Sequence, residues 1–217
     1  MSGYLQIIPI GNSLDVAAAR LAGVPGGLDK ALYQASKRAS DKLKTTASRK
    51  ARERYAISAG NFSKNAPKID IRTGGGSAHA DVSWKGTKFS LSKFSGSSNT
   101  PKWDTSRKVR IKKPDARNGN GGFWAHPGQE GKGHVLKSTS PMTISGSFVA
   151  QFSSGHAGIF HRDGGTTENG AESITESMGL SVPQMVGSDA IKDEIGEEAI
   201  QEFDTRLAHE VERLLGF

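Results

Sequence analysis

Apolar residues recur every three or four positions between Leu28 and Tyr55, a spacing that places them on one face of a helix. Residues 24–27, which contain a proline and two glycines, break the chain just before this stretch. The apolar stripe is rich in alanine, so the predicted helix can pack closely against a neighbour. A second stripe from Ile191 to Leu214 predicts a long closing helix with Ser188 as its N-cap.

Alternating apolar and polar residues predict two hairpins between these helices. Residues 68–72 and 78–84 alternate, and a glycine-rich turn at 73–76 separates them. Residues 147–152 and 157–162 form a second predicted hairpin with a glycine in its turn. A small antiparallel sheet packed with a long N-terminal and a long C-terminal helix is an α+β fold, which is the class we predict.

Shorter segments complete this prediction. Residues 4–10 are predicted to form a short strand. Pro9 indicates an edge position or a strand end, because proline cannot donate to a strand ladder. Residues 58–64 are predicted to form a short helix or a turn, and residues 171–178 a short helix. Residues 182–185 are predicted to be extended, since proline at 183 disfavours helix at the residue before it.

Residues 95–146 are mostly polar and rich in glycine. A connection of this length is unusual inside a compact domain. We therefore expect one α+β domain, residues 1–217, in which 95–146 is an extended insertion or arm that orders against a partner. A surface loop without a partner is the alternative. Within this segment, residues 107–113 alternate as a basic strand would.

The chain has 217 residues and no cysteine, which excludes disulfides, thiolate zinc sites and cysteine nucleophiles. Its hydrophobic content of 35% is low for an enzyme with a deep core. The sequence contains no run of about 20 apolar residues, the length that crosses a bilayer, and its start does not resemble a secretory signal. We therefore expect a protein made in the cytoplasm and used there or in a particle assembled there.

The charges are unevenly distributed, although the formal net charge is only +7. Residues 30–68 contain eleven basic and two acidic residues, and residues 102–117 contain seven basic and two acidic residues. Residues 189–213 contain nine acidic and three basic residues. This separation predicts electrostatic complementarity within the fold or between copies, with solvated helix faces as the alternative.

The residues capable of catalysis or metal binding form no recognised constellation. The six histidines include no HExxH pair, and the Ser153–His156 stretch lacks a third triad member. The glycine-rich residues 119–133 contain no phosphate-binding motif. We expect no enzymatic activity, no metal and no cofactor; a hydrolase that uses the histidines is a minor alternative.

The basic residues are better functional candidates. Cations along a helix can contact phosphates without reading sequence, and aromatic rings among cations can stack on single-stranded bases. An acidic protein surface is an equally suitable target. The candidate contacts to a partner or to DNA are Lys37, Arg38, Lys42, Lys44, Arg49, Arg52, Trp103, Arg107, Arg110, Lys112 and Trp124.

Two strings in the last third of the chain resemble a known family. Residues 147–162, SFVAQFSSGHAGIFHR, resemble the hairpin of the minor tail protein Z family of tailed phages. Residues 174–185, ITESMGLSVPQM, are similar to the family's segment before its closing helix. The basic helix at 28–55 is similar to the family's N-terminal helix. The 95–146 insertion and the polar link at 163–170 depart from the family pattern.

This resemblance implies a structural virion protein without catalytic residues. It would be a tail completion or terminator-type subunit that forms a ring, expected to be hexameric, at the head-proximal end of the tail. Its partners would be the tail tube and the neck or connector proteins, with genomic DNA in the lumen. It would lie in the host cytoplasm during assembly and in the virion afterwards. The alternative is a non-specific nucleic-acid-binding module that uses helix 30–54 and the 102–124 region.

Overall fold

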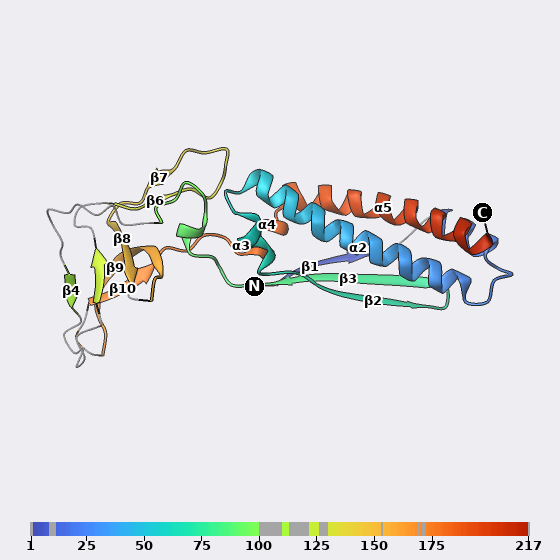
Figure 1. The fold of residues 1–217 in the computed structure, drawn as a ribbon, viewed down its shortest axis with the longest axis horizontal. Helices are drawn as coiled ribbons and strands as arrows, with labels where there is room; N and C mark the ends of the chain where they lie inside the picture. Colours follow the sequence, from blue (N-terminus) through green and yellow to red (C-terminus); the bar gives the residue numbers. More distant parts are fainter. Residues whose placement is uncertain are drawn as a thin grey trace. The chain divides into compact units, whose positions relative to one another are not determined.

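The computed structural model contains long helices and antiparallel sheets, which confirms the predicted α+β class (Figure 1). Two compact units make up the chain. Unit 1 comprises Met1–Ala51, Phe62–Thr87 and Ser181–Phe217, and unit 2 comprises Arg52–Asn61 and Lys88–Leu180. This division differs from the boundaries expected for one domain with an insertion, because unit 2 extends well beyond 95–146 on both sides. The structure describes residues 2–8, 12–99, 110–112, 122–125, 130–152, 154–168, 170 and 172–216.

Unit 1 is built from a sheet and long helices. Strand β3 lies between β1 and β2, and all pairings are antiparallel. Val82 of β3 pairs with Leu5 on one side and Ile69 on the other, so these side chains share one face of the sheet. The elements of this unit are β1 (Ser2–Ile7), α1 (Asn12–Arg20), α2 (Gly27–Arg54, as far as Ala51), β2 (Lys68–Gly74), β3 (Ser77–Lys85), α4 (Val182–Val186) and α5 (Asp189–Leu215).

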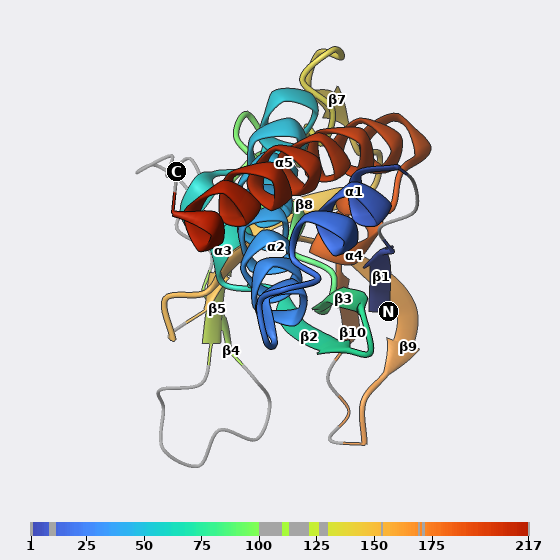
Figure 2. The same cartoon turned by 90° about the vertical axis from the view of Figure 1, so that its right-hand side faces the viewer.

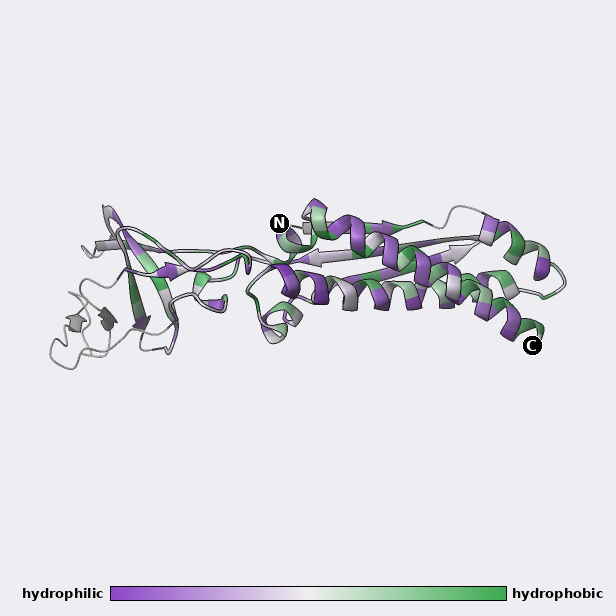
Figure 3. Cartoon of the chain, turned by 90° about the horizontal axis from the view of Figure 1, so that it is seen from above, coloured by the Kyte–Doolittle hydropathy of each residue, from purple (hydrophilic) through white to green (hydrophobic). Residues whose placement is uncertain are grey.

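The two long helices, α2 and α5, lie side by side over the apolar face of this sheet (Figures 1 and 2). Hydrophobic and hydrophilic residues follow one another in turn along both helices (Figure 3), and most of the apolar residues are buried, whereas Tyr33 and Ile200 are exposed. Both predicted long helices and the predicted 68–84 hairpin are therefore confirmed. The buried residues of this layer include Ala31, Leu32, Ala35, Ala39, Leu43, Ala47, Ala51, Val82, Trp84, Ile191, Ile195, Ala199, Phe203, Leu207 and Val211.

Unit 2 contains a second antiparallel sheet with the order β10-β9-β8-β5-β4. Phe148, Ala150 and Phe160 form its buried cluster, and Phe152 and Ile174 pack against it. The predicted hairpin at 147–162 is confirmed as β8 and β9. The elements are η1 (Leu91–Lys93), β4 (Arg110–Lys112), β5 (Gly122–Ala125), β6 (Lys132–Gly133), β7 (Met142–Thr143), β8 (Ser147–Phe152), β9 (Ala157–Thr166) and β10 (Glu172–Glu176). The boundary between the units falls inside α3 (Ala59–Ser63), after Asn61.

Part of the predicted 95–146 arm packs on unit 2. Strands β6 and β7 pair with each other. The backbone N–H of Gly131 donates to Ser147 Oγ at 2.9 Å, and the N–H of Ile144 donates to Gly131 O at 2.9 Å. Residues 130–146 are thus tied to the start of β8. Most of the remaining arm lies outside the described residues.

Two short predictions were wrong. The 171–178 segment, predicted as a helix, contains strand β10, because pairing with β9 brings Ile174 onto the Phe148–Phe160 cluster. The 182–185 segment, predicted as extended, is helix α4. Ser181 and Gln184 form a reciprocal capping box, and Pro183 lies in the first turn, where its missing N–H leaves no helical bond unmade.

Three further details of the fold differ from the prediction. Ser188 occupies the N-cap position of α5, but its hydroxyl makes no cap hydrogen bond and donates to Met185 O at 2.9 Å. Helix α1 was not predicted, because its Asn12–Arg20 segment is only nine residues long. The opening strand was predicted to end at Ile10, whereas β1 ends at Ile7.

Candidate interaction surfaces

The outward face of α2 carries exposed cations. Lys37 and Lys44 are seven residues apart and share one face of α2, and Arg38 and Lys42 are four apart and share another. The structure gives their side chains no ion-pair partner within the described residues. Asp41 lies among them and is exposed as well, so the face keeps a positive balance. The cations are Lys37, Arg38, Lys42 and Lys44, all predicted as candidate contacts.

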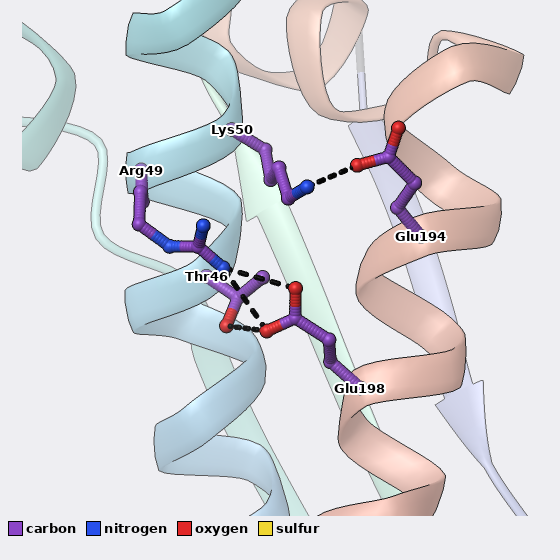
Figure 4. A network of polar contacts seen from close by, with 5 residues as sticks. All are labelled: Thr46, Arg49, Lys50, Glu194 and Glu198. Carbon is purple, nitrogen blue, oxygen red and sulfur yellow. Dashed lines mark hydrogen bonds and ion pairs between the residues drawn. The ribbon is translucent and has the colours of Figure 1, made fainter.

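One flank of α2 is joined to α5 by polar contacts (Figure 4). The guanidinium of Arg49 donates to both carboxylate oxygens of Glu198, at 2.9 and 3.1 Å. The hydroxyl of Thr46 donates to Glu198 Oε2 at 3.0 Å. Lys50 forms an ion pair with Glu194 on the next turn of α5. The predicted complementarity within the fold is therefore present between the basic and the acidic helix.

These contacts determine the protonation behaviour of Glu198. Burial alone would raise the pKa of this carboxyl. The hydrogen bonds from Thr46 and Arg49, with the charges of Arg49 and Lys50, outweigh burial and lower the pKa of Glu198 below its usual value. Arg49 is thus engaged inside the chain. Arg52 is half-buried and has an interaction of its own, so neither candidate is a free cation.

The outer face of α5 is acidic. Asp193, Glu197 and Asp204 are exposed there, and Ile200 between them is 54% exposed. Asp204 accepts a hydrogen bond from the hydroxyl of Ser13 at 2.8 Å. Asp193 and Glu197 have no ion-pair partner in the part of the chain that the structure describes. The helix therefore presents negative charge to its surroundings after its internal pairing with α2.

The candidates in the 102–124 region belong to unit 2. Trp103 and Arg107 lie outside the described residues. Arg110 and Lys112 lie on β4, and Trp124 lies on β5. The register of this pair places Arg110 opposite Trp124. The structure therefore brings a predicted cation and a predicted aromatic residue to neighbouring positions of one sheet.

Unit 2 also has a cavity of about 710 Å³ that the sequence did not predict. Two lysines, Lys93 and Lys137, line it without an acidic residue beside them, and Phe94 and Ile57 supply its apolar wall. These residues come from distant parts of the chain, so no local sequence pattern could have identified them. The remaining lining residues are Ala56, Ser58, Asn61, Ser92, Ser95, Asn99, Gln151, Gly155 and Ala157.

Two of the described histidines, His134 and His156, have contacts that hold their rings within unit 2. His156 Nε2 lies 3.0 Å from Glu176 Oε1, and its ring stacks on Phe152. The ring nitrogens of His134 face the carbonyl oxygens of Ser95 and Thr139, at 2.6 and 2.8 Å. Within the described ranges, His, Asp and Glu side chains form no group that could hold a metal ion.

No protein-family model, curated protein or solved structure matches the chain. The resemblance to the minor tail protein Z family therefore stays a prediction. In the part of the chain that the structure describes, every helix is too short or too polar to cross a bilayer. The two charged helix faces of unit 1 are the features on which a functional argument can be built.

Proposed function

We propose that the protein is a structural subunit of a bacteriophage virion. In this proposal it is a tail completion or terminator-type protein that forms a ring, joins the tail tube to the neck and has no enzymatic role or cofactor. The sequence resemblance supplies the place in the particle. The observation that carries the proposal is that unit 1 presents a basic outer face on α2 and an acidic outer face on α5.

Two unlike surfaces on one body favour assembly in which each copy contacts the next. Such heterologous contacts produce closed rings when the rotation between copies closes, and filaments when it does not. A ring subunit also needs further surfaces for the tube and for the neck. Unit 2 and the region around residues 102–124 supply candidates for these contacts.

The test is to locate the protein in purified particles. Mass spectrometry of tailed particles from cells that express this sequence with its phage should detect the chain, and immunogold labelling should mark the junction of head and tail. Light scattering of the purified protein should give a mass several times that of one 23.0 kDa chain. Absence from the particles would refute the proposal.

The second candidate is a nucleic-acid-binding module, which the free cations of α2 favour. Because such binding releases counterions, its affinity should fall steeply with salt and should not depend on base sequence. Fluorescence anisotropy with duplex and single-stranded DNA at several salt concentrations measures both properties. Tight, sequence-independent binding by a protein that is absent from particles would favour this candidate. DNA contact inside a tail ring would combine the two.

A further inference from the structure

The outer face of α5 carries acidic residues in a regular row. Asp193, Glu197 and Asp204 follow one another at intervals of four and seven residues, and Ile200 lies between the last two. Residues at these intervals share a helix face, so the row extends about 16 Å along α5. We call these four residues the acidic row.

The outer face of α2 carries a matching row. Lys30, Lys37 and Lys44 follow at intervals of seven residues, and all three are exposed. Tyr33, which is 42% exposed, lies between the first two. The row extends about 21 Å along α2. We call these four residues the basic row. Asp41, four residues after Lys37 and three before Lys44, is exposed on the same face, so the face keeps a net charge of +2. In each row an exposed apolar side chain has a charge of the same sign on either side: Lys30 and Lys37 flank Tyr33, and Glu197 and Asp204 flank Ile200.

Neither row is neutralised within its own chain. The contact between α2 and α5 uses a different flank of each helix, through residues such as Thr46, Arg49 and Glu198. In the described residues, the three lysines of the basic row have no ion-pair partner, nor do Asp193 and Glu197. Asp204 accepts a hydrogen bond from the Ser13 hydroxyl of α1 at 2.8 Å, which leaves its negative charge unpaired among the described residues. Tyr33 and Ile200 remain exposed, and an exposed aromatic or aliphatic side chain surrounded by charges is typical of a protein contact.

We propose that the acidic row of one copy docks on the basic row of a second copy, with Ile200 against Tyr33 and ion pairs on either side. This inference rests on the proposed function, because it assigns the contact by which subunits would assemble. The occupant is a second copy because unit 1 itself supplies both complementary surfaces. Since the two rows differ, the contact is heterologous and leaves one row of each end copy available.

Two charge-reversal variants test this contact. The acidic variant, Lys37→Glu with Lys44→Glu, makes both rows negative. The basic variant, Asp193→Lys with Glu197→Lys, makes both rows positive. The control, Lys64→Glu with Lys85→Glu, makes the same charge change as the acidic variant at exposed positions of unit 1 outside α2 and α5. Circular dichroism and thermal unfolding verify that all three variants fold like the parent.

Sedimentation velocity at low salt measures self-association. We expect the parent and the control to associate, and the acidic and basic variants each to associate at least about tenfold more weakly, because like charges face each other. Mixing the two variants should restore association, since the acidic variant retains the native acidic row and the basic variant retains the native basic row. The single substitution Ile200→Ser should also weaken self-association, because it removes the apolar side chain at the centre of the proposed contact without changing the charge.

The outcomes separate this contact from the proposed function. If the parent associates and both variants associate equally well, or if mixing fails to restore association, this contact is wrong while the tail proposal stands. If mixing restores association but the protein is absent from phage particles, the contact stands and the tail proposal fails. A parent that stays monomeric, and binds duplex DNA that the acidic variant does not bind, would overturn the contact and assign the basic row to nucleic acid.

Discussion

Replacing Leu207 by alanine measures how much α5 contributes to the stability of unit 1. Leu207 is 1% exposed, whereas Ile200 on the same helix is 54% exposed. Leu207→Ala removes three buried carbon atoms, which at about 0.8 kcal/mol each gives about 2.4 kcal/mol of lost transfer free energy. The cavity left behind raises the expected loss of unfolding free energy to about 3–4 kcal/mol. Ile200→Ala removes a similar side chain and should cost less than about 1 kcal/mol.

The assay must report on unit 1 alone, because two compact units can unfold separately. Trp84 is 1% exposed in the unit 1 core, and the other two tryptophans lie at 103 and 124. Replacing those two by phenylalanine leaves Trp84 as the only fluorescent indole. Urea unfolding followed by Trp84 fluorescence then gives the unfolding free energy of unit 1 for each variant.

Equal unfolding free energies for the Leu207 and Ile200 alanine variants would refute the reasoning, because they would show that α5 does not bury its Leu207 face. Leu207→Asp provides a stricter form of the same test. It places an unpaired charge in an apolar layer, which should cost several kcal/mol and prevent soluble expression. An aspartate variant that expresses and unfolds like the parent would exclude the packing of α5 on the sheet.

Three further predictions concern other contacts. Ser40→Ala should raise the unfolding free energy by about 1 kcal/mol, since the fully buried Ser40 hydroxyl has no hydrogen-bond partner among the described residues; a lower melting temperature would contradict this. Glu198→Gln should lower the unfolding free energy by about 1 kcal/mol at pH 7. Because folding lowers the pKa of Glu198, the stabilisation by its carboxylate is present above pH 4.5 and should be lost as the pH falls below 4.5. Urea unfolding at several pH values measures this loss. Gly179→Ala should destabilise unit 2 by about 1–3 kcal/mol, because the new Cβ at position 179 would overlap the Phe94 ring. The control Gly165→Ala adds a Cβ where there is room, so in thermal melts it should unfold like the parent.

The long elements could be predicted because their pattern is repeated many times. The stripe of α2 covers seven turns or more, so a few ambiguous residues do not obscure its period. Strand β3 alternates over nine residues, and its buried positions follow that alternation. Elements of this kind are determined by the local order of apolar and polar residues, and tertiary contacts reinforce that order.

The short elements depend on tertiary contacts, or on local sequence signals other than hydrophobic periodicity. Strand β10 exists because β9 pairs with it and Ile174 meets Phe160, a tertiary contact that no local pattern reveals. Helix α4 did have a local signal, since Ser181 and Gln184 have the spacing of a capping box. Proline disfavours helix at the residue before it, but the first helical turn tolerates proline, which is where Pro183 lies.

The pairing of the two long helices explains why their remaining charges matter. Cations are distributed around most of the exposed surface of α2, but only the flank with Arg49 and Lys50 faces α5. A helix meets a neighbouring helix along one flank, so internal pairing cannot neutralise a row such as Lys30, Lys37 and Lys44. The half-buried internal pairs are also screened less by salt than a contact between exposed rows would be. Added salt should therefore weaken association between copies long before it changes the stability of unit 1, which separates the structural role of the charges from their proposed role in assembly.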